Sequence, residues 1–167
     1  MKSIFINFNV FEGKKYSISE AEVVGDVPIE EEVYTSIIDS LKGLTYSQAQ
    51  ITSIEEFFTN VLGNRGFAFA EVSGDPEIDD DTNEVKIVFS VVPGKRTYTR
   101  KILFTGNNIT QDHVLRREMR QFEGAWSSNN SIEAGKVRLE RLGYFKEVEV
   151  ETIPVPNTDD QIDVMYS

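Results

Sequence analysis

The sequence of 167 residues contains no cysteine and a single histidine, His113. Without cysteine the chain forms no disulfide, has no thiol nucleophile and offers no thiolate ligand to zinc or an iron–sulfur cluster. One histidine leaves nothing from which to build a His-based metal site or a catalytic triad. Carboxylates are numerous, but nothing marks two of them as a catalytic acid and base. We therefore expect a protein that is not an enzyme and that uses no cofactor or metal.

Long apolar runs are also missing, because no stretch approaches the roughly 20 apolar residues of a membrane span. The first residues could suggest a signal peptide, but Asn7 and Asn9 interrupt their apolar side chains. The apolar residues there alternate with a period of two, which is typical of a strand.

Basic residues are scarce, and the deficit lies in one half of the chain. Residues 14–92 contain 5 Lys and Arg against 16 Asp and Glu, whereas residues 93–167 contain 11 of each. The formal net charge of −11 therefore belongs to the first half. Phosphate binding requires clustered basic residues, so nucleic acid is not expected as a partner.

An internal repeat organises the chain. Aligning Gly13 with Gly94 brings the following residues into step at an offset of 81, and the loss of four residues in the second copy later changes the offset to 77. The matched positions include Ala21 and Ile102, Val23 and Phe104, Gly25 and Gly106, Ile38 and Met119, Gly43 and Gly124, and, at the second offset, Gly66-Phe67 and Gly143-Tyr144.

The same register extends backwards to the start of the chain. We predict that residues 1–13 are the last strand of a truncated preceding repeat, that residues 14–93 form one repeat, and that residues 94–167 form the next. This pattern favours a piece of a longer array. The matches at the start are Ile4 with Val85, Ile6 with Ile87, Phe8 with Phe89 and Val10 with Val91.

Each copy is predicted to fold as strand, helix, helix, strand, strand. The expected ranges are 17–24, 29–42, 48–63, 67–73 and 84–92 in the first copy, and 99–105, 110–123, 131–142, 145–152 and 161–166 in the second. Three strands cannot bury both faces of their sheet, so the two helices must cover one face in a two-layer α+β unit. The link between the copies is only about six residues, which predicts a limited set of relative orientations.

Local signals support the first predicted helix of the second copy. Leu115, Met119 and Phe122 fall at i, i+4 and i+7 and predict one buried stripe. Thr110 is a suitable N-cap, and Gly124 fits the position after the helix, where a positive φ favours glycine.

The order of elements, in tandem, resembles POTRA repeats. The segment from Ile109 to Trp126, ITQDHVLRREMRQFEGAW, closely resembles the last, barrel-proximal POTRA domain of the BamA-type outer-membrane assembly proteins, as do RLERLGYF at 138–145 and DQIDV at 160–164. The first copy resembles the penultimate domain more loosely, through Tyr16-Ser17-Ile18 and Arg65-Gly66-Phe67-Ala68-Phe69.

This resemblance implies a periplasmic portion of a gram-negative outer-membrane protein, followed by a C-terminal β-barrel. It also implies two kinds of partner, namely unfolded outer-membrane protein clients and lipoproteins of the assembly complex. Two alternatives stay open, a POTRA pair of a related translocation or secretion transporter and a stand-alone calcium- or ligand-binding module. The acidic segment Asp79–Glu84 lacks the Gly and Glu that a calcium loop requires at positions six and twelve.

The second predicted strand of each copy is the first candidate interaction site. Two strands of a three-stranded sheet are edges, and an extended client can add a strand there through sequence-tolerant main-chain hydrogen bonds. The alternative is an ordinary edge strand with a solvated face. The candidate residues are Phe69, Glu71 and Val72 in the first copy and Phe145, Val148 and Val150 in the second.

A basic cluster is the second candidate, for docking a lipoprotein or the rim of the barrel. Arg116, Arg120 and Glu123 are expected on one helix face at i, i+4 and i+7, with Arg117 beside them. Arginine suits bidentate pairing with carboxylates. The alternative is a solvated face with intrahelical ion pairs, each of which contributes only a few tenths of a kcal/mol. Trp126 is expected to anchor the loop after this helix against the domain.

Overall fold

The computed structural model describes residues 13–167, so the strand predicted at residues 1–13 lies almost entirely outside the described residues. The first unit contains β1 (Ser17–Gly25), α1 (Glu31–Ser40), α2 (Gln48–Asn64), β2 (Glu71–Asp79) and β3 (Glu84–Val92). The second contains β4 (Tyr98–Phe104), α3 (Asp112–Arg116), α4 (Asn129–Arg141), β5 (Val150–Pro154) and β6 (Gln161–Tyr166). The predicted order of elements is therefore confirmed in both copies.

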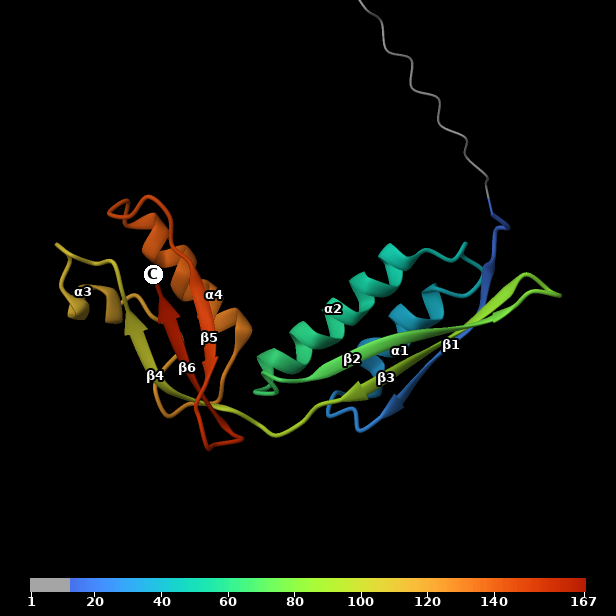
Figure 1. The fold of residues 1–167 in the computed structure, drawn as a ribbon, viewed down its shortest axis with the longest axis horizontal. Helices are drawn as coiled ribbons and strands as arrows, with labels where there is room; N and C mark the ends of the chain where they lie inside the picture. The colour runs from blue at the N-terminus through green and yellow to red at the C-terminus, as the bar shows by residue number, and fades with distance from the viewer. Residues whose placement is uncertain (1–12) are drawn as a thin grey trace, which may run out of the picture.

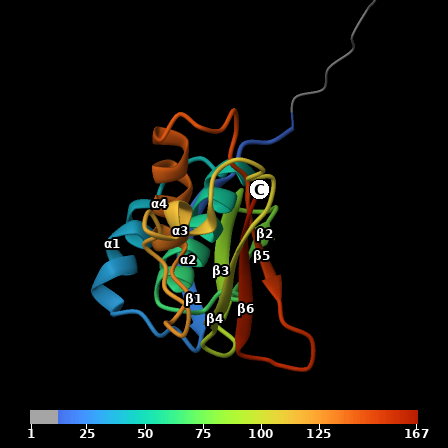
Figure 2. The ribbon, with the colours of Figure 1, turned by 90° about the vertical axis from the view of Figure 1, so that its left-hand side faces the viewer.

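Both units have the same three-stranded sheet. The strand orders are β1-β3-β2 and β4-β6-β5, and the last strand of each unit lies in the middle. In each sheet the middle strand runs parallel to the first strand and antiparallel to the second. Figure 1 shows the two units along the long axis of the molecule, and Figure 2 shows their helices on the same side of the two sheets. This is the two-layer α+β architecture expected from the sequence.

Each unit has its own core between its helices and its sheet. In the first unit Ile51, Phe58 and Leu62 of α2 are fully buried against Phe89 of β3. In the second, Leu139 of α4 packs with Tyr166 of β6, whose hydroxyl donates to the carbonyl of Ile132. Burial raises the pKa of Tyr166 to about 12. Each fully buried side chain of this size contributes about 1.5–3 kcal/mol to the hydrophobic driving force.

The predicted helix over 110–123 is wrong in its length. Helix α3 ends at Arg116, so Arg117, Arg120 and Glu123 lie in the turns that follow it, and Gln111 rather than Thr110 is the N-cap. Phe122, predicted in the core, is 66% exposed. Gln121 turns inward instead, where its amide donates to the carbonyl of Trp126 and accepts from the N–H of Ser128. The helical spacing on which the stripe depended is therefore lost.

The second strand of each unit begins later than predicted. Residues Phe67 to Ala70 form a tight turn, because the N–H of Phe67 bonds to Leu62 and that of Ala70 bonds to Phe67. Strand β2 therefore starts at Glu71, and β5 starts at Val150. Phe69, Phe145 and Val148, which were predicted within these strands, precede them. Val148 is buried, whereas Phe69 is exposed.

The link between the units is bonded to the turn that ends α2. The N–H and the hydroxyl of Thr97 both donate to the carbonyl of Gly66, at 2.7 and 2.8 Å. The Nε of Arg96 donates to the carbonyl of Arg65 at 3.0 Å. Its guanidinium carbon lies 3.5 Å from the ring centroid of Trp126. We call this set of contacts the joint.

Helix α4 of the second unit also receives part of its capping across the joint. The side-chain oxygen of Asn64, the last residue of α2, accepts from the N–H of Asn130 at 2.7 Å. The first backbone N–H groups of a helix have no partner within it, so this bond satisfies one of them. A Cβ atom on Gly63 would lie 2.2 Å from the amide nitrogen of Asn129. Glycine at this position therefore allows the two helix ends to meet.

We expect the joint to hold the two domains in one relative orientation in solution. A double variant, Arg96→Ala with Thr97→Val, removes the stacked guanidinium and a hydroxyl bond and should therefore broaden the distribution of orientations. Residual dipolar couplings from both domains provide the measurement, with Lys95→Ala as a matched change in the link. Couplings that fit one unchanged orientation in the double variant would contradict the assignment.

We expect Gly74→Ala in β2 to lower the free energy of unfolding by about 1–3 kcal/mol, the usual cost of overpacking a core. A Cβ at this position would lie 2.5 Å from Cγ2 of Ile51 and 3.0 Å from Cε1 of Phe89. Urea unfolding measures the change. The neighbouring exposed Ser73→Ala should stay within about 0.5 kcal/mol of the parent, and equal effects of the two variants would refute the packing argument.

Candidate interaction surfaces

The outer strands of the two sheets are the candidate binding edges. Along its outer side, each has backbone N–H and C=O groups that are not hydrogen-bonded to another strand of the sheet. The edges are β1 and β2 in the first unit and β4 and β5 in the second. An added strand needs these groups to be free. The partners of the outward backbone groups therefore decide which edges can bind an extended chain.

The β4 edge is closed by two side chains of the basic cluster. The N–H of Ile102 donates to Oε1 of Glu123 at 2.8 Å, and the carbonyl of Ile102 accepts from Nη2 of Arg116 at 2.9 Å. Nη1 of Arg116 also donates to Oε1 of Glu123 at 3.0 Å. Arg116 and Glu123 thus act together on one backbone position, and we call them the guard pair.

The electrostatics of the guard pair favour its ionised form. The N–H of Ile102, together with Arg116, holds the pKa of Glu123 below its usual range. The guanidinium of Arg116 lies 5.6 Å from the ring centroid of Phe104, and its Nε is 3.8 Å from Oδ2 of Asp112. The predicted helix face shared by Arg116, Arg120 and Glu123 is wrong, because α3 ends at Arg116. Arg116 and Glu123 meet instead across the turns that follow this helix.

The β2 edge is closed at its middle by other means. The N–H of Gly74 donates to Oε1 of Glu55 on α2 at 2.7 Å. Two residues later Pro76 has no N–H to offer. Glu71 and Val72 lie at the start of this strand, outside the closed stretch, and Phe69 lies before it. The sequence analysis missed Glu55, since no local pattern marks a carboxylate that reaches a strand 19 residues away.

The β5 edge is open at its outward positions. Glu149 exchanges both backbone hydrogen bonds with Ser167 on the side of β6, at 2.9 and 3.1 Å. Along an antiparallel strand, the backbone groups of successive residues point alternately toward and away from the partner strand. Since those of Glu149 point toward β6, the N–H and C=O of Val150 and Thr152 point away from it. Within residues 13–167 no side chain bonds to these groups. Pro154 ends the strand.

The remaining arginines of the basic cluster face solvent. Arg117 bonds to Glu118 at 3.3 Å, and Glu118 also accepts from Arg138 of α4 at 2.7 Å. These bonds, chiefly that from Arg138, lower the pKa of Glu118. Arg120 is exposed, and within the described residues it forms no ion pair. The guanidinium of Arg120 is thus available for an acidic partner.

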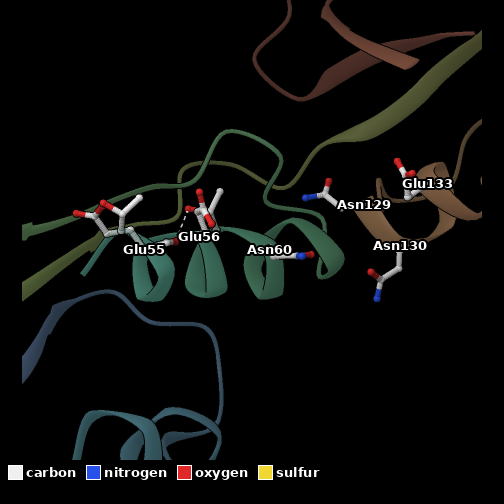
Figure 3. Close-up of a pocket in the computed structure, with 8 residues that line it drawn as sticks. Glu55, Glu56, Asn60, Asn129, Asn130 and Glu133 are labelled. Atoms are coloured by element: carbon white, nitrogen blue, oxygen red, sulfur yellow. Dashed lines mark hydrogen bonds between the residues drawn. The ribbon is translucent and has the colours of Figure 1, made fainter. Parts of the chain in front are cut away.

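Two further features complete the surface. An open hollow of about 470 Å³ lies beside the joint. Figure 3 shows side chains that line it, among them Glu55, Glu56, Asn60, Asn129, Asn130 and Glu133. In the hairpin between β2 and β3, Oδ1 of Asp79 accepts from the N–H groups of Asp81 and Thr82.

Over residues 13–167, no three histidine or carboxylate side chains are grouped so that they could hold a metal ion.

Among the helices of the described part of the chain, none is both long enough and apolar enough to cross a bilayer.

We expect the guard pair to stabilise the second unit in a pH-dependent way. The folded pKa of Glu123 is lowered, so its ionised form stabilises the fold above the unfolded pKa, and this contribution is lost as the pH falls through the folded pKa. Glu123→Gln should lower the melting temperature at about pH 6, and the gap to the parent should narrow as the pH falls below about 4.5, the ordinary pKa of glutamate. The exposed Glu147→Gln is the control; a gap for Glu123→Gln that does not change with pH would argue against the charge.

The POTRA family profile, described as surface antigen variable number repeat, matches residues 16–94 and again residues 97–167. The outer membrane protein assembly factor BamA of Neisseria meningitidis is 31% identical over 97% of this chain and 20% of that protein. BamA of Buchnera aphidicola is 34% identical over 99% of this chain and 27% of that protein. The chain therefore spans between a fifth and about a quarter of the length of these relatives.

Solved structures agree with the sequence relatives. Haemophilus influenzae BamA POTRA3-5 superposes with a TM-score of 0.85 at 33% identity, over 93% of this chain and 61% of that chain. BamA of Haemophilus ducreyi lacking POTRA domains 1-3 gives a TM-score of 0.78 at 40% identity, over 90% of this chain and 29% of that chain. The chain belongs to the POTRA family, as two tandem POTRA domains similar to those of the outer membrane protein assembly factor BamA.

Proposed function

We propose that this pair of POTRA domains is the barrel-proximal, periplasmic part of an outer-membrane protein assembly factor. In this role it guides unfolded outer-membrane proteins by strand addition and docks lipoproteins of the assembly complex. The relatives named as outer membrane protein assembly factors support the role in assembly. The observation that carries the strand-addition mechanism is the open backbone of the β5 edge.

Strand addition suits a protein that handles many clients. Main-chain hydrogen bonds are independent of the client's side chains, and an exposed edge supplies them in register. Val150 and Thr152 present free N–H and C=O groups on β5, with buried Val148 just before the strand. The β2 edge supports this mechanism less well, because Glu55 and Pro76 occupy or remove its central donors. We therefore place the client edge among the second strands at β5, next to Phe145, Val148 and Val150.

The basic cluster divides into two roles. Arg116 and Glu123 bond to the backbone of Ile102, so they position the segment after α3, although both side chains remain exposed. Arg117 and Arg120 lie on that segment and are exposed. We place the contact with a lipoprotein at Arg117 and Arg120, where guanidinium groups can form charge-assisted bonds with carboxylates. In this proposal Arg116 and Glu123 hold the docking residues in place.

We expect charge reversal at Arg120 to weaken the complex without unfolding the domain. Arg120→Glu, introduced into the full-length assembly protein, should reduce the amount of lipoprotein recovered with it after detergent extraction. A charged contact of this kind changes affinity by about 1.5–3 kcal/mol, or more than tenfold. The matched control is Arg141→Glu, a charge reversal at an exposed residue at the end of α4. Circular dichroism and urea unfolding of the present fragment establish that each variant folds.

The outcome separates docking from stability. Loss of the lipoprotein with Arg120→Glu but not with Arg141→Glu supports the docking site. Equal recovery in both variants and in the parent would refute it, and the arginines would then be a solvated face.

A further inference from the structure

The β1 edge of the first domain occupies the same place as the guarded β4 edge of the second. Ala21 pairs with Ile87 in the parallel β1–β3 ladder, and Ile102 pairs with Val164 in the β4–β6 ladder. Both ladders have an irregularity just before this position, at Ile18/Glu20 and at Thr99/Lys101. The outward N–H and C=O that the guard pair takes up at Ile102 therefore have their counterparts at Ala21.

The first domain has no guard pair. The residues 81 positions before Arg116 and Glu123 are Thr35 and Lys42. Thr35 is in α1, where its hydroxyl donates to the carbonyl of Glu31. Within residues 13–167 no side chain bonds to the backbone of Ala21 or of Val23, the next outward position. The β1 edge thus leaves two consecutive outward positions free for another strand.

The two faces of β1 differ in chemistry. Ala21 and Val23 are partly buried and pack against the core of the first domain. Glu20 and Glu22 alternate with them and lie on the other face, where Glu22 forms a 3.0 Å ion pair with Lys86 of β3. Both carboxylates raise the pKa of Lys86, through its bond to Glu22 and through the charge of Glu20. Strand β1 has no Lys or Arg, and the domain around it carries the whole net negative charge of the chain.

We propose that the β1 edge is a second site for an extended polypeptide, one in which apolar residues alternate with Lys or Arg. The added strand bonds to the backbone of Ala21 and Val23. Its apolar residues continue the helix-covered face, and its basic residues lie opposite Glu20 and Glu22. This inference rests on the proposed function, since it names another edge and the charge pattern of the clients that bind it.

The guard pair explains why this site belongs to the first domain alone. The equivalent edge of the second domain has its outward N–H and C=O already bonded at Ile102, so a strand that paired there would have to displace two charge-assisted bonds. The two domains therefore offer opposite edges, β1 in the first and β5 in the second. The least obstructed edges of the two domains are thus on different outer strands.

The test uses the capped peptide Lys-Val-Lys-Val-Lys-Val-Lys and amide hydrogen exchange of the ¹⁵N-labelled fragment, followed by NMR. The free N–H groups of Ala21 and Val23 should exchange rapidly without the peptide and become protected with it. The same peptide with N-methylated valines cannot complete the ladder and is the matched control. Ile102 should be protected in both conditions, because Glu123 holds its N–H.

A charge variant checks the specificity. Glu20→Lys should weaken binding of the lysine peptide about two- to fivefold, the range expected for one cross-strand charge pair. Glu147→Lys changes the net charge equally in the second domain and should leave binding at β1 unchanged. Equal weakening by both variants would show that only net charge attracts the peptide, and would overturn the assigned pairing.

The exchange pattern also separates this inference from the function on which it rests. Protection at Ala21 and Val23 supports the β1 site. Protection confined to Val150 and Thr152 overturns the β1 site and leaves strand addition standing at β5. The absence of protection anywhere at millimolar peptide overturns both. In a folded Glu123→Ala variant, peptide-dependent protection should also appear at Ile102, and its failure to appear would refute the role of the guard pair.

Discussion

The outward hydrogen-bonding groups of a three-stranded sheet are the constraint on which the functional surface of this molecule depends. The central strands, β3 and β6, are paired on both sides, so each unit must expose two edges. The chain meets this constraint differently at each one. A glutamate from a helix and a proline close the middle of β2, an arginine–glutamate pair closes β4, and β1 and β5 keep free positions. In the proposed function, this uneven closure decides which edge an extended client can join.

The joint likewise satisfies backbone groups that would otherwise have no hydrogen-bond partner, here at the ends of helices in the two domains. Backbone carbonyls at the end of α2 lack partners within the helix, and the link between the domains supplies donors from Arg96 and Thr97. Asn64 in turn satisfies a donor at the start of α4. Each domain thus completes a helix end of the other. The short link already limits the relative orientations of the two domains, and these bonds restrict them further.

Much of the fold could be predicted from the sequence, because the repeat and the alternation of apolar residues are local patterns. The third strand of each unit matches its predicted range, 84–92 and 161–166. Gly124 has the expected positive φ, but it does not follow a helix, because α3 ends at Arg116. The end of α3 could not be predicted, since it depends on the inward turn of Gln121. The closure of the edges was also beyond prediction, because Glu55 and Arg116 act on strands distant in the sequence. The docking and client residues themselves stay predictions.

The bond from Asn64 to the first turn of α4 has a consequence for the order of folding. A helix whose N-terminal donors are partly satisfied by the preceding domain gains that stabilisation only after the preceding helix has ended correctly. The second domain therefore gains this part of its helix capping only when the first domain is folded. Arg96 and Thr97 in turn complete the end of α2, so either domain studied alone should be less stable than in the pair.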